Sequence, residues 1–327
     1  MVFVDSLDLK EFRGIRAFEK PLELAKFNVL VGRNNSGKSA ILHALSLLPH
    51  PDITLPMSLN VRNWKTRIGV FEDLLGGKSS AIYRYAGAAS LAFTVKEKAC
   101  HVEIGERGDL FFLEDEQINA NTCCARLDID AERAKDLVAF VPNESGFLRS
   151  LEERLREAWT AIEKSEAHVR VVKEIINRSV NDTFTEIIVR EHELYARKEV
   201  HGNPFYVKVR DLGDGVEKIL SVLLWLETSS PELVLWDDFE ASFHPSLLKR
   251  VLEWLIKKDW QVVIATHSID VLLKLLDTEF ESNDCSLLLL QKTPDDLLLQ
   301  NRLTLEELED VVSSNQDQRL LPDLLTL

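Results

Sequence analysis

The sequence predicts an α/β fold built around a parallel sheet. The observations behind this are apolar runs of strand length, helix-periodic segments between them, and a glycine-rich turn that joins one apolar run to a helix. At 327 residues and 45% hydrophobic composition, the chain is long enough to bury an ample core. We therefore expect residues 1–327 to form a single mixed α/β domain with two lobes.

The first third of the chain is rich in predicted strands. Period-two and largely apolar runs predict strands over 2–9, 17–24, 27–31, 90–95 and 102–104, the last two within a strand-rich region from about 68 to 113. After Gly32 the pattern turns helical, with apolar residues at spacings of three and four from Ala40 until Pro49 stops the helix. The order is strand, glycine-rich turn, helix.

The middle of the chain changes character. Residues 131–188 are charged and helix-periodic, most clearly over 151–159, which favours a helical lobe over a coiled coil with several uninterrupted heptads. From residue 204 helices and strands alternate, as in a parallel sheet. Helices are predicted over 215–227, 245–257 and 269–276, and strands over 233–236, 261–265 and 286–290.

This order predicts the boundaries of the lobes. One lobe is expected over about residues 1–115 and 230–300, and the helical lobe over about 116–229. An acidic C-terminal helix is expected over about 303–312, with Thr304 and Glu307 as a capping box. This helix either closes the fold or docks a partner.

Composition and charge exclude several classes of protein. No apolar stretch approaches the ~20 residues of a membrane span, and the N-terminus lacks a basic signal region, so we expect a cytoplasmic protein with no membrane partner. The four cysteines include no C-x-x-C pair, so neither a zinc site nor a disulfide framework is indicated. The net charge of −15 argues against coating nucleic acid by bulk electrostatics, although residues 277–327 alone hold 12 acids and 3 bases.

A phosphate-binding loop follows the strand at 27–31. The sequence fits G-x-x-x-x-G-K-[ST], in which glycines let backbone N–H groups and a helix N-terminus point at a phosphate. In this pattern Lys38 bridges the β- and γ-phosphates, and the hydroxyl of Ser39 is a Mg²⁺ ligand. The predicted nucleotide-binding residues of the loop are Gly32, Arg33, Asn34, Asn35, Ser36, Gly37, Lys38 and Ser39.

Further polar residues follow two other predicted strands. Asp237 and Asp238 end the strand at 233–236, where the first acid can hold the Mg²⁺ shell and the second can polarise water. Solvated loop residues are the alternative interpretation. His267 follows the strand at 261–265 and is either a satisfied core histidine or a functional group.

Together with the glycine-containing segment at 212–215, these motifs resemble the ABC-class ATPase heads of the SMC, RecF and OLD (overcoming lysogenization defect) group. The opening segment at residues 9–15 and Asn34 of the phosphate loop also match that group. The resemblance implies an ABC-type P-loop ATPase head that uses ATP and Mg²⁺ and closes as a homodimer around ATP. The residues that would complete the opposite site in trans, a relaxed form of L-S-G-G-Q, are Leu212, Gly213, Asp214 and Gly215.

The same resemblance implies roles for the acids and the histidine. Asp237 matches the Mg²⁺-linked acid, Asp238 the catalytic glutamate, and His267 the switch histidine that senses the γ-phosphate. Glu240 matches a further acid and is the reserve catalytic base. Because Asp238 is one methylene shorter than glutamate, we expect slow hydrolysis.

The sequence leaves the roles of several other residues near the nucleotide open. Arg13 and Arg33 either neutralise phosphate charge or lie on the surface. The residue that usually enters the Mg²⁺ shell from the loop between the two lobes is not evident, with Asn143 and Gln117 as the candidates.

The resemblance implies an OLD-like ATPase domain without a Toprim nuclease. Such a head would drive a process of DNA repair or maintenance, or an anti-phage or toxin-type system, through a separate effector protein that is a nuclease or a toxin. The alternative is an ATP-sensing scaffold that hydrolyses slowly or not at all. Duplex DNA is a further candidate ligand, since residues 149–210 hold 12 basic and 11 acidic residues.

Overall fold

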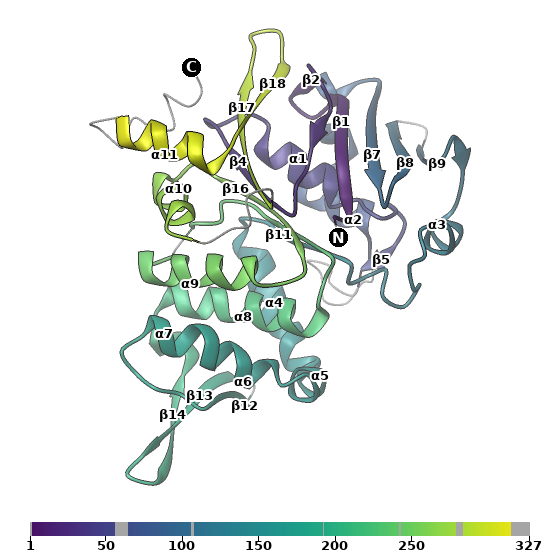
Figure 1. The fold of residues 1–327 in the computed structure, drawn as a ribbon. Coiled ribbons are helices and arrows are strands. Elements are labelled where there is room, and N and C mark those ends of the chain that lie inside the picture. Colours follow the sequence, from purple (N-terminus) through teal and green to yellow (C-terminus); the bar gives the residue numbers. More distant parts are fainter. Residues whose placement is uncertain are drawn as a thin grey trace.

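A 13-stranded mixed sheet forms the centre of the computed structural model, which describes residues 2–55, 65–105, 108–191, 193–241, 243–278 and 284–314 (Figure 1). The strand order is β10-β9-β8-β7-β1-β2-β18-β17-β4-β16-β15-β11, with β3 paired to β1. These strands are β1 (Val4–Phe12), β2 (Ile15–Phe18), β3 (Leu22–Glu23), β4 (Phe27–Val31), β7 (Ala88–Val95), β8 (Lys98–Gly105), β9 (Gly108–Leu113), β10 (Glu116–Gln117), β11 (Val138–Val141), β15 (Leu233–Trp236), β16 (Gln261–Thr266), β17 (Cys285–Lys292) and β18 (Leu297–Leu303).

Five neighbouring strands of this sheet, β17, β4, β16, β15 and β11, run parallel. Their side chains alternate between two hydrophobic cores: Val29 and Val262 face one core, whereas Leu30 and Val263 face the other. Burial on both faces explains why these strands read as apolar runs rather than as alternating patterns.

Helices cover both faces of the sheet. α1 and α2 share a core with β1 and β7, whereas α8, α9 and α10 pack on the opposite face of the parallel strands. The helices are α1 (Lys38–Leu45), α2 (Arg67–Leu75), α3 (Ala120–Arg126), α4 (Ser145–Glu157), α5 (Trp159–Lys164), α6 (Ala167–Val171), α7 (Asn177–Ser179), α8 (Asp214–Ser229), α9 (Pro245–Ile256), α10 (Ile269–Leu276) and α11 (Leu305–Ser314).

A helical lobe, formed mainly by α4 to α8, lies below the sheet in Figure 1. A three-stranded sheet of β12 (Glu186–Arg190), β13 (Glu193–Val200) and β14 (Asn203–Lys208) packs beneath it, and the β13–β14 hairpin projects from the molecule. Shorter elements are a β5 (Thr54–Leu55) and β6 (Lys65–Thr66) pair, the 3₁₀ turns η1 (Lys78–Ala81), η2 (Tyr83–Tyr85) and η4 (Val209–Leu212), and the π-helical turn η3 (Val172–Ile176). The predicted combination of mixed sheet and helical lobe is confirmed.

The strand-rich region expected over residues 68–113 is wrong in its first part. α2 occupies this part, with Thr66 as N-cap accepting a hydrogen bond from the Gly69 N–H at 3.2 Å and Gly76 as a left-handed C-cap. The strands begin only at β7, and the predicted segments 90–95 and 102–104 lie in β7 and β8. The helix forms because Ile68 and Phe71, three residues apart, bury one face.

The boundary between lobes expected at residue 116 is also wrong. β10 pairs with β9, and β11 pairs parallel with β15 inside the large sheet. Cys123 and Cys124 of α3 belong to the same hydrophobic core as α1. The helical lobe therefore begins only after β11.

The small sheet of β12, β13 and β14 was not predicted. Its inner face is apolar, and Ile187, Leu194 and Ala196 join the core of the helical lobe. The helix-periodic region expected from the sequence ends at residue 188, and residues 189–203, which include the end of β12 and all of β13, carry no assignment of their own. Smaller differences concern element ends: β1 extends to Phe12, the strand expected at 17–24 divides into β2 and β3, and α1 ends at Leu45 rather than near Pro49.

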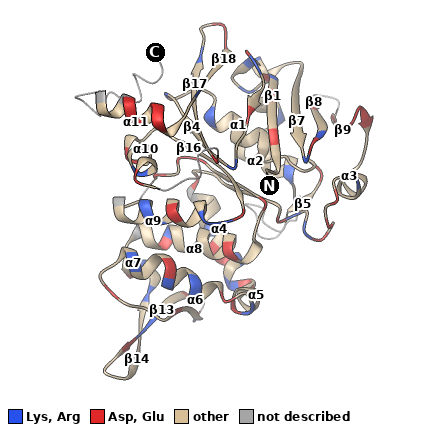
Figure 2. Ribbon diagram, viewed as in Figure 1, with Lys and Arg blue, Asp and Glu red and all other residues tan. Residues whose placement is uncertain are grey.

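Charge is distributed unevenly over the fold (Figure 2). Four acids lie on α11, whose described part carries no base, and the capping box expected before it is present: the Glu307 side chain accepts from the Thr304 N–H at 2.7 Å, and the Glu307 N–H donates to the Thr304 hydroxyl at 3.2 Å. Basic residues appear on α6, α7 and β13 of the helical lobe.

Among the helices that are described, none is both long and apolar enough to cross a membrane.

The side chain of Gln261 ties the N-terminal strand to the parallel strands. It is fully buried at the start of β16, where its carbonyl oxygen accepts from the N–H groups of Phe3 (3.1 Å) and Val4 (2.8 Å). Its amide nitrogen donates to the carbonyls of Val4 (2.8 Å) and Ala25 (3.0 Å). All of its hydrogen-bonding capacity is therefore used inside the core.

We expect Gln261→Leu to lower the free energy of unfolding by roughly 3 kcal/mol, because it leaves buried backbone groups without partners. Urea unfolding followed by circular dichroism measures this. The control is Gln300→Leu, which removes hydrogen bonds to the Lys20 and Pro21 carbonyls at the surface, where water can replace them. Its cost should stay below about 1 kcal/mol, and equal costs for the two variants would contradict the prediction.

A histidine lies in the core beside α1. His43 packs edge-on against Phe71 and Phe140, and its Nδ1 accepts a hydrogen bond from the guanidinium of Arg13. Burial, together with the positive charge of Arg13, lowers its pKa from 6.5 to about 3. The ring is therefore neutral at ordinary pH.

Stability should fall as the pH drops from 6.5 toward 3, because the unfolded chain binds a proton at His43 in this window and the folded chain does not. The loss attributable to this group approaches about 1.4 kcal/mol per pH unit in the steep part of the window. Urea unfolding of wild type and His43→Gln between pH 7 and pH 4.5 should show a shallower slope for the variant. His201→Gln at an exposed turn is the control, and parallel slopes for wild type and His43→Gln would refute the assignment.

Candidate functional site

The carboxyl ends of the parallel strands meet along one edge of the sheet. Val31 at the end of β4 is paired with both Thr266 of β16 and Leu289 of β17, and Trp236 at the end of β15 is paired with Ile264 of β16. The segments that follow these strands are therefore neighbours. This register brings together the predicted phosphate loop, the acid pair, His267 and the end of β17.

The phosphate loop has the close packing that its glycines predict. A Cβ on Gly32 would lie 2.5 Å from the carbonyl oxygen of Leu290 and 2.5 Å from the hydroxyl of Ser36, so no larger residue fits. Gly37 has φ of +96°, which favours glycine. Lys38 Nζ donates to the carbonyls of Gly32 (2.7 Å) and Arg33 (3.0 Å), which holds the ammonium group inside the loop.

Asp237 lies directly beside the first turn of α1. Its carboxylate accepts a hydrogen bond from the Ser39 hydroxyl, and its N–H donates to the carbonyl of Val141 at 2.9 Å. Burial is the main cause that raises the pKa of Asp237, whereas the hydrogen bond from Ser39 and the charge of Lys38 act in the opposite direction. The two predicted Mg²⁺ ligands are thus in contact, and their oxygens are the donors that this ion prefers.

Asp238, Glu240, His267 and Asn143 form a second cluster beside Asp237. Asn143 Nδ2 donates to Asp238 Oδ2 at 2.8 Å, and His267 Nδ1 lies 3.6 Å from Asp238 Oδ1 and 3.1 Å from Glu240 Oε1. The backbone N–H of His267 also donates to Glu240 Oε1 at 3.1 Å. His267 is more than half exposed, so it is not a satisfied core histidine.

Asn143 and Gln117 are the two candidates for the polar residue that reaches the site from the loop between the lobes. Asn143 follows β11 at one end of the sheet, whereas Gln117 belongs to β10 at the opposite end of the strand order. Of the two candidates, the fold therefore places only Asn143 beside the acids. Its position depends on the pairing of β11 with β15, which a single sequence does not reveal.

The two arginines have different environments. Arg13, in the turn between β1 and β2, directs its guanidinium at His43, and burial lowers its pKa while the charge of Asp237 raises it. Arg33 is exposed on the phosphate loop beside Leu290 and Gln291. Arg13 lies at the wall of the site, and Arg33 lies on the outer side of the loop.

An open cavity of about 230 Å³ contains the phosphate loop. Its lining residues are Arg13, Gly14, Ile15, Asn34, Asn35, Ser36, Gly37, Lys38, Ser39, Ala40, Asp238 and Lys292. Lys292 was not predicted, because it is brought there by the pairing of β17 with β4.

The segment at 212–215 lies away from this cavity within one chain. Leu212 ends η4, Gly213 has φ of +106° as N-cap, and α8 begins at Asp214, followed by Gly215. Of the side chains described in this segment, none lines the cavity of the phosphate loop. Within a single copy of the chain, this segment is therefore not placed at the predicted nucleotide-binding site.

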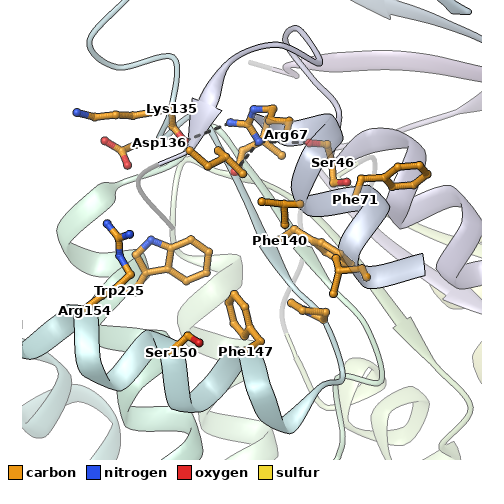
Figure 3. A pocket seen from close by; sticks show the side chains of 15 residues that line it. Ser46, Arg67, Phe71, Lys135, Asp136, Phe140, Phe147, Ser150, Arg154 and Trp225 are labelled. Carbon is orange, nitrogen blue, oxygen red and sulfur yellow. Dashed lines mark hydrogen bonds between the residues drawn. The ribbon is translucent and has the colours of Figure 1, made fainter. Parts of the chain in front are cut away.

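A smaller cavity lies where the two lobes meet, between α2, β11, α4 and α8 (Figure 3). The fully buried guanidinium of Arg67 borders it and donates to four carbonyls at 3.2 to 3.3 Å, those of Ser46, Val138, Ala134 and Lys135. Burial lowers the pKa of Arg67 to about 9. Because Ser46 caps α1 and Val138 begins β11, Arg67 joins the helix after the phosphate loop to the strand before Asn143.

Residues 53–274, more than half of the chain, match the family described as "AAA domain, putative AbiEii toxin, Type IV TA system". Residues 2–56 match a second family, described as "Protein of unknown function (DUF2813)". No curated protein is similar enough in sequence to count as a relative.

Solved structures show the same fold at low sequence identity. The SMC head domain of Pyrococcus furiosus, with an extended coiled coil and bound to the C-terminal domain of ScpA, has a TM-score of 0.60 at 13% identity, over 96% of this chain and 99% of that chain. The SMC head domain of Thermotoga maritima has a TM-score of 0.53 at 14% identity, over 93% and 99%. The recombination mediator protein RecF (RecF-ATPrS, RecFOR pathway) has a TM-score of 0.50 at 11% identity, over 91% and 98%.

The narrower likeness to OLD proteins stays a prediction. The family match and the shared fold agree with the phosphate loop, the acid pair and the helical lobe. The chain belongs to the family described as "AAA domain, putative AbiEii toxin, Type IV TA system". It has the fold of an ABC-class P-loop ATPase head.

Proposed function

We propose that this protein is an ATP-binding and ATP-hydrolysing head that dimerises around ATP and gates the action of a separate effector. The observation that carries this proposal is the contact between Ser39 of the phosphate loop and Asp237 of the acid pair. This contact joins the loop that would hold the triphosphate to the acids that would act on it. A nucleotide-binding loop without such acids would bind ATP but would lack the groups for hydrolysis.

The residues present fit a Mg²⁺ ion bound together with ATP. Ser39 and Asp237 would hold it, and Asp237 is a half-buried carboxylate whose pKa is raised mainly by burial. No group of three or more His, Cys, Asp or Glu side chains among the described residues is arranged to hold a metal ion by itself. This agrees with an ion that is shared between two protein oxygens and nucleotide phosphates, where it would neutralise developing charge.

Hydrolysis would use the cluster around Asp238. Its carboxylate is about one third exposed, lines the cavity, and is held by the amide of Asn143, so it can accept a hydrogen bond from an attacking water. Lys38 would stabilise negative charge on the phosphates. His267 would contact the γ-phosphate, and its contact with Glu240 would link that acid to the presence of the γ-phosphate. Glu240 is the reserve base, although its contact with His267 occupies one of its oxygens.

The proposed dimer explains the place of residues 212–215. The described side chains of this segment do not line the cavity of their own chain, and a second copy in head-to-tail arrangement would bring the segment to the opposite nucleotide. ATP would then hold the dimer closed, and hydrolysis would open it. The SMC heads, for which a complex with ScpA is solved, support a head that acts on a partner protein.

The output of the cycle is proposed from the relatives. The family description names a putative toxin of a type IV toxin–antitoxin system, and RecF is described as a recombination mediator protein. A toxin-type or anti-phage system and a process of DNA maintenance are therefore the two proposed outputs. A nuclease or toxin is the proposed effector, and duplex DNA is a candidate ligand. The second function, an ATP-sensing scaffold with little turnover, is favoured by the short side chain of Asp238, which Asn143 already engages.

Lys38→Ala should abolish ATP binding, or reduce turnover by at least about a hundredfold, since it removes the cation that contacts the phosphates. Calorimetry with ATP and Mg²⁺ and a phosphate-release assay, both with and without duplex DNA at low salt, measure these effects. Lys20→Ala at the surface is the control. Unchanged turnover in Lys38→Ala would refute the assignment of the phosphate loop, whereas ATP binding by wild type without phosphate release would favour the scaffold.

Asp238→Asn should slow hydrolysis and trap the ATP-bound dimer. With ATP and Mg²⁺, light scattering should give about twice the monomer mass of 37.3 kDa. The double variant Lys38→Ala, Asp238→Asn is the control and should stay monomeric, because it lacks the nucleotide that joins the two copies. A monomeric mass for Asp238→Asn under conditions in which it binds ATP would contradict the proposed dimer.

A further inference from the structure

The end of β17 runs beside the phosphate loop. β17 pairs parallel with β4 up to Leu289 and Val31, so the residues after Leu289 accompany those after Val31. The Leu290 carbonyl approaches Gly32 so closely that a Cβ there would lie 2.5 Å away. Lys292, two residues further on, is thereby placed next to the loop.

The ammonium group of Lys292 points into the nucleotide site. Nζ donates to the carbonyl of Gly14 at 3.0 Å, in the turn that also carries Arg13. A Cβ on Gly14 would lie 3.5 Å from this Nζ and 3.8 Å from Oδ1 of Asn35 in the phosphate loop. The side chain of Lys292 is only 14% exposed, so its position is set by its surroundings.

Lys292 lines cavities on both sides of the phosphate loop. One is the cavity that contains Lys38 and Asp238, and the other lies between Arg33 and Gln291 on the outer side of the loop. Arg13 and Lys38 line the first cavity as well. Lys292 is therefore an additional positive charge at the place where a triphosphate would lie.

Lys292 forms an ion pair with Asp296, and this carboxylate has a second hydrogen-bond partner. Lys292 Nζ lies 2.9 Å from Asp296 Oδ1, and the other oxygen of Asp296 accepts a hydrogen bond from the Tyr83 hydroxyl at 2.8 Å. If the ammonium group turned away, Asp296 would keep Tyr83 as a partner and would remain about one third exposed to water. The ion pair can therefore open without leaving a buried charge unpaired.

We propose that Lys292 is a nucleotide-contacting residue that exchanges Asp296 for the phosphates of bound ATP. This inference rests on the proposed function and adds a binding residue to the same site. A triphosphate carries several negative charges, so it attracts the ammonium group more strongly than a single, partly solvated carboxylate does. Asp296 then acts as a competitor that holds the lysine while nucleotide is absent.

The exchange predicts opposite effects of two substitutions on the affinity for ATP with Mg²⁺, measured by isothermal titration calorimetry. Lys292→Met should weaken binding by about tenfold, because it removes a charge-assisted contact to phosphate. Asp296→Asn should strengthen binding, because it removes the competitor. A merely structural ion pair would instead weaken binding in both variants.

Two further variants serve as controls. Lys198→Met removes a lysine of similar exposure that is paired with Asp182 on the small sheet, and it should bind ATP like wild type. Lys292→Arg keeps the charge and should restore most of the affinity lost in Lys292→Met. It also tests the proposal if the methionine variant folds poorly. Wild-type binding should fall more steeply with added NaCl than binding by Lys292→Met.

The outcomes separate this inference from the proposed function. ATP binding that is lost in Lys38→Ala but unchanged in Lys292→Met would overturn the role of Lys292 alone. The same conclusion would follow if Lys292→Arg bound as weakly as Lys292→Met, or if Asp296→Asn weakened binding as much. A folded wild-type protein that does not bind ATP would overturn both.

Discussion

The parallel pairing of β17, β4, β16, β15 and β11 is the constraint on which the site depends. Both faces of these strands are buried, with Val29 in one core and Leu30 in the other, so a slip of one residue would exchange the two sets of side chains. Such a slip would also separate the loops that follow the strands. The cores therefore determine the register, and the register determines which polar residues meet.

The polar groups at this edge hold one another in the absence of nucleotide. Lys38 is bound by carbonyls of its own loop, Asp237 accepts from Ser39, and Lys292 is paired with Asp296. Isolated charges at such partly buried positions would be costly. Ligand binding at this site would consist mainly of the exchange of existing partners, which limits the cost of assembling so many charges in a small volume.

The two lobes are joined where β11 meets the acids. Asn143 follows β11 and contacts Asp238, and α4 begins two residues later and packs on α8. Arg67 links the end of α1 to the start of β11 on the other side of the junction. Asn143 therefore connects the start of the helical lobe to Asp238 through a short segment of chain.

The sequence alone was sufficient for features that depend on neighbouring residues. The phosphate loop, the acids after residue 236 and the capping box at Thr304 are local patterns, because a strand, a turn and a helix cap are each specified within a few positions. The N-cap of α2 at Thr66 is also a local pattern, yet it was missed because the segments around it resemble strands. The small sheet was missed because charged residues interrupt the apolar pattern of β13, so that no run of strand length stands out there.

The tertiary structure decided which distant segments meet. Asn143 lies beside Asp238, and Lys292 beside Gly14, only because β11 pairs with β15 and β17 with β4. Arg13 faces His43 because the first turn folds over α1. Strand order is set by the summed burial of many side chains across the sheet, and no single segment of the chain carries that information.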